Sequence, residues 1–257
     1  MIMAEMSVAE VGRRLVRAGG LSTKPLCVYG AEEVKEGWVP TGKINYCLVK
    51  ALLWLSTKDL PPAFVGMDVL KGCCPGGAIH LGYAEAPEGL KFFLSTGIPS
   101  YRGGFAEYYR RSPEMVEETE RIAGKVTAIA RNVVFRPCED MGEDEEAVSV
   151  MCFGTAEQIR NIFALYYFSS TNVFGGIIAA GGSACATLIT YPSGMSANAP
   201  RDAMFVGPTD PTVNRYFPPD FMGLGIPMGV ARKMCEHIEE SFVVKRPEIA
   251  FPEERDG

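Results

Sequence analysis

The sequence predicts an α/β fold (or an α+β fold), built as a mixed sheet flanked by helices. Three observations favour it: short β-rich runs alternate with amphipathic stretches, the runs end at glycine or proline, and a helix–strand–turn–helix pattern occurs twice. The chain has 257 residues and 47% of them are hydrophobic, so it can bury a substantial core without disulfide bonds. We expect one α/β domain over residues 1–245 and a proline-containing tail over residues 246–257.

Capping residues and the helical spacing of apolar residues predict the helices. The first helix has Ser7 at its N-cap and Glu10 at the capping-box position. Another follows Cys74, because Pro75 suits the first turn of a helix, where its missing N–H would be unpaired anyway. Ser112, followed by proline, caps a further one, and Thr155 caps the helix that begins at residue 156. We expect helices over residues 7–17, 45–55, 76–83, 112–123, 156–168, 183–191 and 227–242.

Short apolar and β-branched runs predict the strands. We expect strands over residues 25–30, 64–67, 91–97, 132–138, 147–153 and 173–181. The acidic segment EDMGEDEE, residues 139–146, separates two of these strands. It is most simply a solvated hairpin loop, with a divalent cation site as the alternative.

Two stretches of the chain resemble each other at a separation of about 110 residues. NYCLVKALLWL with FVGMDVLKGCCPGGAIHLG, and RNIFALYYF with NVFGGIIAAGGSACATLI, both read as helix, strand, glycine–cysteine turn and helix. The pattern predicts two related halves, about residues 1–125 and 126–245, whose turns face one another. In this alignment Cys74 and Cys185 meet at a central cleft.

Composition and charge argue against several classes of protein. The net charge is −6 and there is no long basic run, which disfavours nucleic acid and anionic membranes as partners. Residues 1–20 are amphipathic and charged, unlike a signal peptide, so we expect a cytoplasmic protein with eight reduced cysteines. Residues 161–200 carry no charge but are rich in glycine, which favours a buried segment around a pocket, or a homo-oligomer contact, over a membrane span.

Three cysteines are the candidate ligands of a cofactor. Cys74 lies at a predicted helix N-terminus, where unpaired N–H groups favour the thiolate. Gly76 and Gly77 let a ligand approach the backbone closely. Cys185 has similar glycine-rich surroundings, and Cys47 follows Lys43 by one helical turn.

Thiolates from three segments suit an iron–sulfur cluster, with [4Fe–4S] as the first candidate, or another soft metal. Cys73 is the substitute ligand for its neighbour Cys74. The other four cysteines are expected to fill the core instead: Cys27, Cys138, Cys152 and Cys235. His80 is expected in the core or beside the site, and Arg215, in a proline-rich loop, is a candidate catalytic residue that would clamp a carboxylate or phosphate.

Five motifs together resemble a known family. They are KPLCV, NYCLVKA, CPGGAIHLG, GGSACA and RYFPPD. Over about residues 7–242 the chain resembles the archaeal and bacterial family called domain of unknown function 169, which is common in anaerobes. The resemblance implies that Cys47, Cys74, Gly76, Gly77 and Cys185 are family positions, together with Arg215.

These patterns leave several functions open. The first is an iron–sulfur or other soft-metal protein with a small-molecule pocket, engaged in redox or sulfur-transfer chemistry with a small-molecule ligand or redox partner. The second is a metal-free enzyme with Cys74 as nucleophile, for which no histidine base is evident. The third is a metal-free module that binds a small molecule, and the fourth is a structural subunit whose cysteines only pack.

Overall fold

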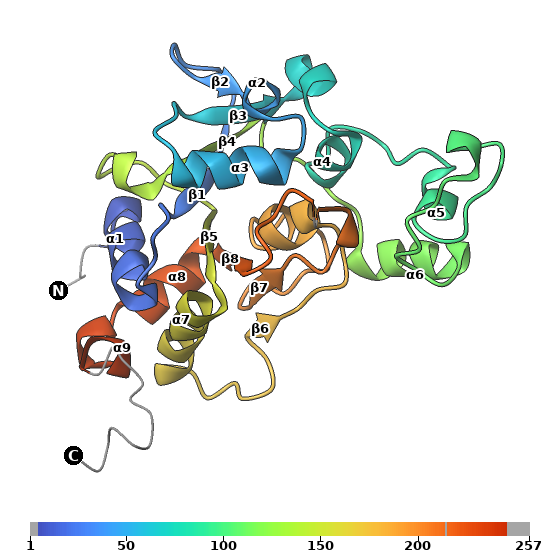
Figure 1. Cartoon of the computed structure of the whole chain (residues 1–257). Helices are drawn as coiled ribbons and strands as arrows, with labels where there is room; N and C mark the ends of the chain where they lie inside the picture. Colours follow the sequence, from blue (N-terminus) through green and yellow to red (C-terminus); the bar gives the residue numbers. More distant parts are fainter. Residues whose placement is uncertain (1–4, 214, 246–257) are drawn as a thin grey trace.

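The computed structural model describes residues 5–213 and 215–245, so the expected tail, residues 246–257, lies outside the described residues. The described residues form a mixed eight-stranded sheet in the order β2-β3-β4-β1-β5-β8-β7-β6, with helices packed around it (Figure 1). The expected α/β class is confirmed. The strands are β1 (Leu26–Ala31), β2 (Val39–Pro40), β3 (Ala63–Gly66), β4 (Asn132–Pro137), β5 (Ser149–Thr155), β6 (Ile177–Ile178), β7 (Met204–Gly207) and β8 (Phe221–Pro227).

The helices begin largely where the capping residues predict. Ser7 accepts a backbone hydrogen bond at the start of α1, Ser112 does so at α6, and Thr155 forms a complete capping box at α7. The α-helices are α1 (Val8–Gly19), α2 (Thr41–Ile44), α3 (Leu48–Thr57), α4 (Pro75–His80), α5 (Leu90–Phe93), α6 (Pro113–Ala123), α7 (Ala156–Phe168), α8 (Met228–Cys235) and α9 (Phe242–Lys245). Shorter helical turns are η1 (Met67–Gly72), η2 (Arg102–Gly104), η3 (Cys138–Asp140), the π-helical η4 (Ala186–Thr190), η5 (Pro211–Val213) and η6 (Ile238–Glu240).

The sheet has an internal twofold pattern centred between β1 and β5. Outwards from the centre, β1-β4-β3-β2 on one side matches β5-β8-β7-β6 on the other. In both halves the two inner pairings are antiparallel and the outermost pairing is parallel. The α3 crossover between β2 and β3 is therefore equivalent to the η4 crossover between β6 and β7. When the two halves of the sheet are matched in this way, Cys47 corresponds to Cys185. Strand β4 then belongs to the first half, with β1, β2 and β3.

Two separate hydrophobic cores lie on the two faces of the sheet. Along β1, Leu26 and Val28 pack into one core while Cys27 packs into the other, because successive strand side chains point to opposite faces. One core contains buried side chains of α1, α7 and α8. The other contains α3, the Cys73–Tyr83 segment and the segment around η4. The second face is the one that carries the predicted site.

Two glycines of β8 allow η4 to lie directly on the sheet. A Cβ atom on Gly223 would lie 2.7 Å from Leu188 Cδ1, and one on Gly225 would lie 2.7 Å from the Leu188 carbonyl oxygen and 2.6 Å from Pro192 Cγ. Such distances are shorter than van der Waals contact, so a side chain at either position would displace η4. Residues 161–200 thus contain the larger part of α7, together with β6 and η4. Among the described residues, no helix has both the length and the apolar character that a membrane span requires.

Several sequence-based expectations are wrong. Residues 91–97 are not a strand: backbone bonds from Phe93 N to Gly89 O and from Leu94 N to Leu90 O make a helical turn, α5, which projects beside α6 away from the sheet (Figure 1). The acidic segment 139–146 is not a hairpin loop, because β1 lies between β4 and β5.

Other elements differ in extent from the prediction. The strand expected over 173–181 is reduced to β6, and the helix expected over 227–242 divides into α8, η6 and the start of α9. Three strands were not expected at all, namely β2, β7 and β8. Their sequences are short or rich in glycine and proline, so they carry little strand signal of their own.

Helix α1 offers a matched test of close packing in the first core. A Cβ atom on Gly12 would lie 2.5 Å from Cys138 Cβ, whereas a Cβ on Gly229, in α8, meets no atom within 4 Å. We expect Gly12→Ala to lower the free energy of unfolding by about 1–3 kcal/mol through overpacking. Gly229→Ala should leave it unchanged or raise it by up to about 1 kcal/mol, since alanine favours the helix. Urea unfolding measures both, and equal stability of the two variants would contradict the prediction.

Candidate functional site

Four cysteines from three chain segments converge on the α3 and η4 face of the sheet. Cys47 is the N-cap of α3, Cys73 and Cys74 immediately precede α4, and Cys185 is the N-cap of η4. All four lie in or against the same hydrophobic core. The Cys74 sulfur interacts with the Cys185 and Cys73 thiols, and its charge reaches Cys47. The structure thus brings the three predicted ligands together, and their substitute Cys73 with them.

Backbone contacts hold the Cys73–Cys74 turn against the segment that carries Cys47. The Cys74 N–H donates to the carbonyl of Tyr46 at 3.0 Å. Gly42 in α2 and Gly72 are so close that a Cβ on Gly42 would lie 1.9 Å from the Gly72 oxygen. No other residue than glycine fits at position 42 without moving the turn.

Different contacts bring Cys185 to the same place. The Thr190 hydroxyl of η4 donates to the carbonyl of His80, the last residue of α4. The Ala184 N–H donates to Asp210 Oδ2 at 3.4 Å. These bonds fix the residues on both sides of Cys185 relative to α4 and to the loop after β7.

Cys74 is the residue best placed to be a thiolate. Hydrogen bonds from Cys185 and then from Cys73 hold its pKa well below the usual range, assisted by the backbone N–H groups of Leu48 and Gly77. The Gly77 N–H lies 3.4 Å from Cys74 Sγ. These two N–H groups belong to the first turns of α3 and α4, where backbone donors have no partner within the helix. Cys74 is also the one cysteine of the four that is not buried.

The three neighbouring thiols are held in the neutral form. Hydrogen bonding to Cys74 and burial raise the pKa of Cys185 and of Cys73. Burial raises the pKa of Cys47, and the negative charge of Cys74 adds to the increase. The site therefore concentrates one negative charge on one sulfur and surrounds it with thiols that can donate to it.

The two predicted glycines have different surroundings. A Cβ atom on Gly77 would lie 2.7 Å from Cys73 Sγ and 3.3 Å from Cys74 Sγ, so both sulfurs face the space that a side chain would fill. A Cβ on Gly76 would meet no atom within 4 Å. Gly77 forms the floor of the sulfur site, while Gly76 leaves its outer side open.

The donor set suits a soft metal in its chemistry, since thiolates bind iron–sulfur clusters, zinc and copper(I). Within the described ranges, however, no group of three or more histidine, cysteine, aspartate or glutamate side chains is arranged to hold a metal ion. Metal binding would therefore have to draw these sulfurs closer together, as is common when ligands are not preformed.

The remaining predicted residues lie in different places. Arg215 is exposed, and its guanidinium carbon stands 4.6 Å above the ring of Tyr216. His80 ends α4, where burial lowers its pKa and keeps the imidazole neutral. The four cysteines assigned to packing lie buried in the opposite core: Cys27, Cys138, Cys152 and Cys235.

Two acidic residues carry little signal in the sequence: Asp210, whose charge reaches Cys47, and Glu107, which interacts with Asp210. Asp210 is 7% exposed, and its charge acts on Cys47 and on His80. Glu107 is half-buried, and its pKa is raised first by burial and then by Asp210.

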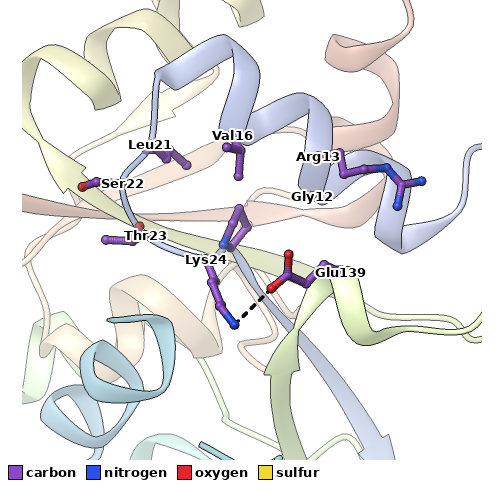
Figure 2. Close-up of a pocket in the computed structure, with 9 residues that line it drawn as sticks. Gly12, Arg13, Val16, Leu21, Ser22, Thr23, Lys24 and Glu139 are labelled. Atoms are coloured by element: carbon purple, nitrogen blue, oxygen red, sulfur yellow. Dashed lines mark ion pairs between the residues drawn. The ribbon is translucent and has the colours of Figure 1, made fainter. Parts of the chain in front are cut away.

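Two surface hollows lie away from the cysteines. One, of about 330 Å³, is formed by α1, the Leu21–Pro25 segment and Glu139 (Figure 2). Figure 2 shows the Lys24 ammonium pointing at Glu139, and the two form an ion pair at 3.1 Å. The other, of about 490 Å³, lies between the end of α7 and α8. Neither is lined by a cysteine, so we place the candidate chemistry at the sulfur cluster.

The lowered pKa of Cys74 predicts a distinctive pH dependence. An ordinary thiol loses reactivity about tenfold for each pH unit below its pKa of about 8.5. Because Cys74 remains a thiolate well below that value, its alkylation rate constant with iodoacetamide should be nearly flat between about pH 8 and about pH 6. Peptide mass spectrometry measures the rate, with glutathione as the control. A tenfold fall per unit at Cys74 would contradict the prediction.

Comparison with known proteins gives one match. A family model described as uncharacterised ArCR, domain of unknown function 169, matches residues 14–237. No curated protein and no solved structure matches the chain. The matched range includes the four converging cysteines and all eight strands. Because it covers well over half of the 257 residues, the chain belongs to the domain of unknown function 169 family.

Proposed function

We propose that this protein is a thiolate-ligated soft-metal protein, with a [4Fe–4S] cluster as the leading candidate. The supporting observation is the convergence of four cysteines from three segments on one thiolate, Cys74. The four cysteines of the opposite core are all buried, whereas Cys74 is partly accessible. Reduced thiols of this kind suit a cytoplasmic location.

In this proposal Cys47, Cys74 and Cys185 hold the metal, and Cys73 is the substitute ligand. A cluster with three protein ligands supplies an iron that is open to a small molecule or to sulfur, whereas a fully ligated one transfers electrons to a redox partner. The protein contributes N–H groups that stabilise sulfur charge, and Gly76 leaves the outer side open.

A second candidate function is a metal-free cysteine enzyme. It is favoured by the accessibility of Cys74 together with its two backbone donors, which suit a nucleophilic thiolate. The neutral thiols of Cys73 and Cys185 beside it are placed to resolve a mixed disulfide. His80 is neutral and feels the charge of Cys74, although it forms no side-chain hydrogen bond with it among the described contacts.

Anaerobic purification distinguishes the two functions. We expect the protein to contain iron and acid-labile sulfide. It should also show a broad absorption band at about 400 nm, as thiolate-bound iron does. Colourless protein without metal, in which Cys74 alone is alkylated rapidly, would favour the second function and contradict the first.

A matched pair of cysteine variants tests whether the Cys74 sulfur binds the metal. Cys74→Ala should abolish most of the bound metal, because it removes the sulfur on which the other three converge. Cys235→Ala, which removes a cysteine from the opposite core, should leave the metal content per folded protein unchanged. Metal analysis with circular dichroism measures both. Equal metal content in the two variants would exclude Cys74 as a ligand.

The adjacent glycines provide a sharper steric test. Gly77→Ala places a methyl group where it meets Cys73 Sγ and Cys74 Sγ, whereas Gly76→Ala meets nothing within 4 Å. We expect Gly77→Ala to lower metal content or, in metal-free protein, the alkylation rate of Cys74 by about tenfold, because displaced sulfurs lose their N–H donors. Gly76→Ala should behave as the unmodified protein in both measurements. Identical results for the two variants would contradict the site geometry.

A further inference from the structure

The larger of the two surface hollows, about 490 Å³ in volume, lies between the end of α7 and the start of α8. Its volume falls within the range of about 300–1,000 Å³ that is usual for small-molecule sites. Three of its lining residues, Tyr166, Val230 and Met234, also pack in the first hydrophobic core, whereas the four converging cysteines belong to the core on the other face of the sheet. A ligand in this hollow would therefore occupy a site separate from the sulfur cluster.

Two cationic side chains line the hollow without a carboxylate partner. Arg201 lies shortly before β7, and Lys233 lies in α8. Neither forms an ion pair with a described residue, whereas Arg232, next to Lys233 in the chain, pairs with Glu146 at 2.7 Å. The positive charges of Arg201 and Lys233 therefore remain available to an anion that enters the hollow.

The guanidinium of Arg201 is seated against the backbone at Gly194. A Cβ atom on Gly194 would overlap Nη1 of Arg201, so the guanidinium occupies the space of the missing side chain. Gly194 has a φ angle of 70°, which favours glycine. A planar guanidinium binds a carboxylate or phosphate through two parallel hydrogen bonds, and the lysine ammonium adds a compact second charge.

Polar residues after α7 add neutral hydrogen-bonding groups to the lining. Ser169, Ser170, Thr171 and Asn172 lie where the chain leaves α7 and turns towards β6 (Figure 1). The Asn172 N–H donates to Ser170 Oγ at 3.2 Å, which holds this segment in a turn. Hydroxyl and amide groups can donate to the oxygens of a bound anion and so orient it.

One carboxylate, Asp202, also lines the hollow. It forms no ion pair with Arg201, with Lys233 or with any other described residue. Two cations and one carboxylate leave the lining net positive, although the whole chain carries a net charge of −6. The local charge thus favours an anion, and Asp202 opposes it.

We propose that this hollow binds a small molecule through a phosphate or carboxylate group, and that Arg201 and Lys233 bind that group. The apolar part of the molecule contacts Tyr166 and Val230, which line the same hollow. The site is independent of the metal or thiolate chemistry at Cys74, because it lies on the other side of the sheet. It adds a ligand-binding function to the one proposed for the cysteines.

Isothermal titration calorimetry of the full chain tests the proposal with two probes, inorganic pyrophosphate and succinate, at about 0.1 M ionic strength. We expect saturable binding of at least one probe, and the tighter of the two identifies the group that the hollow prefers. Arg201→Gln and Lys233→Gln should each weaken this binding about tenfold, as expected for the loss of a hydrogen bond to a charged group. Asp202→Asn should strengthen it, because it removes a repulsive charge.

Two further variants locate the binding. Gly229→Glu places a carboxylate in the hollow, where a Cβ meets no atom within 4 Å, so it should abolish binding while circular dichroism shows folded protein. Arg111→Gln removes an exposed cation outside the hollow and should leave binding unchanged. Binding of neither probe, an equal loss in Arg111→Gln, or weaker binding in Asp202→Asn would overturn the proposal. Metal content and Cys74 alkylation test the proposed function separately.

Discussion

The candidate site depends on one interaction, the stabilisation of negative charge on the Cys74 sulfur. Hydrogen bonds from the Cys185 and Cys73 thiols contribute most, and the backbone N–H groups of Leu48 and Gly77, in the first turns of two different helices, add to them. These donors have no partner within their own helices, so the sulfur satisfies groups that would otherwise need water. The charge on Cys74 then keeps Cys73 and Cys185 protonated. One thiolate among neutral thiols is a starting point both for metal binding, which releases the remaining protons, and for disulfide chemistry.

The convergence is made possible by glycines that let backbones approach closely. Gly42 lies against Gly72, Gly77 lies under two sulfurs, and Gly223 and Gly225 let η4 rest on β8. At each of these positions a methyl group would occupy space already filled by another segment. These contacts connect the cysteines to the sheet, so the sulfur positions depend on packing as well as on the local turns. A small backbone shift at any of these glycines would change the positions of the sulfur atoms.

The twofold pattern of the sheet explains why two of the cysteines occupy similar places. Cys47 and Cys185 are the N-caps of the equivalent crossovers, α3 and η4, and both crossovers pack in the same core. Cys73 and Cys74, by contrast, belong to a turn with no cysteine counterpart in the second half. The site therefore combines a symmetric pair with one asymmetric addition, and the asymmetric part carries the thiolate.

The sequence by itself determined the α/β class, the caps of α1, α6 and α7, and the position of Cys74 before α4, because capping and helical periodicity are local properties of a few neighbouring residues. The sequence also singled out Cys74 and Cys185 by their glycine-rich neighbours, and Cys47 by its place shortly after Lys43. Only the tertiary structure decided that β1 separates β4 from β5, that residues 91–97 are helical, and that β7 and β8 complete the sheet. The tertiary structure alone placed Asp210 near the sulfurs. Strand pairing and charge juxtaposition join residues far apart in the chain, and no local pattern records which distant partner each segment meets.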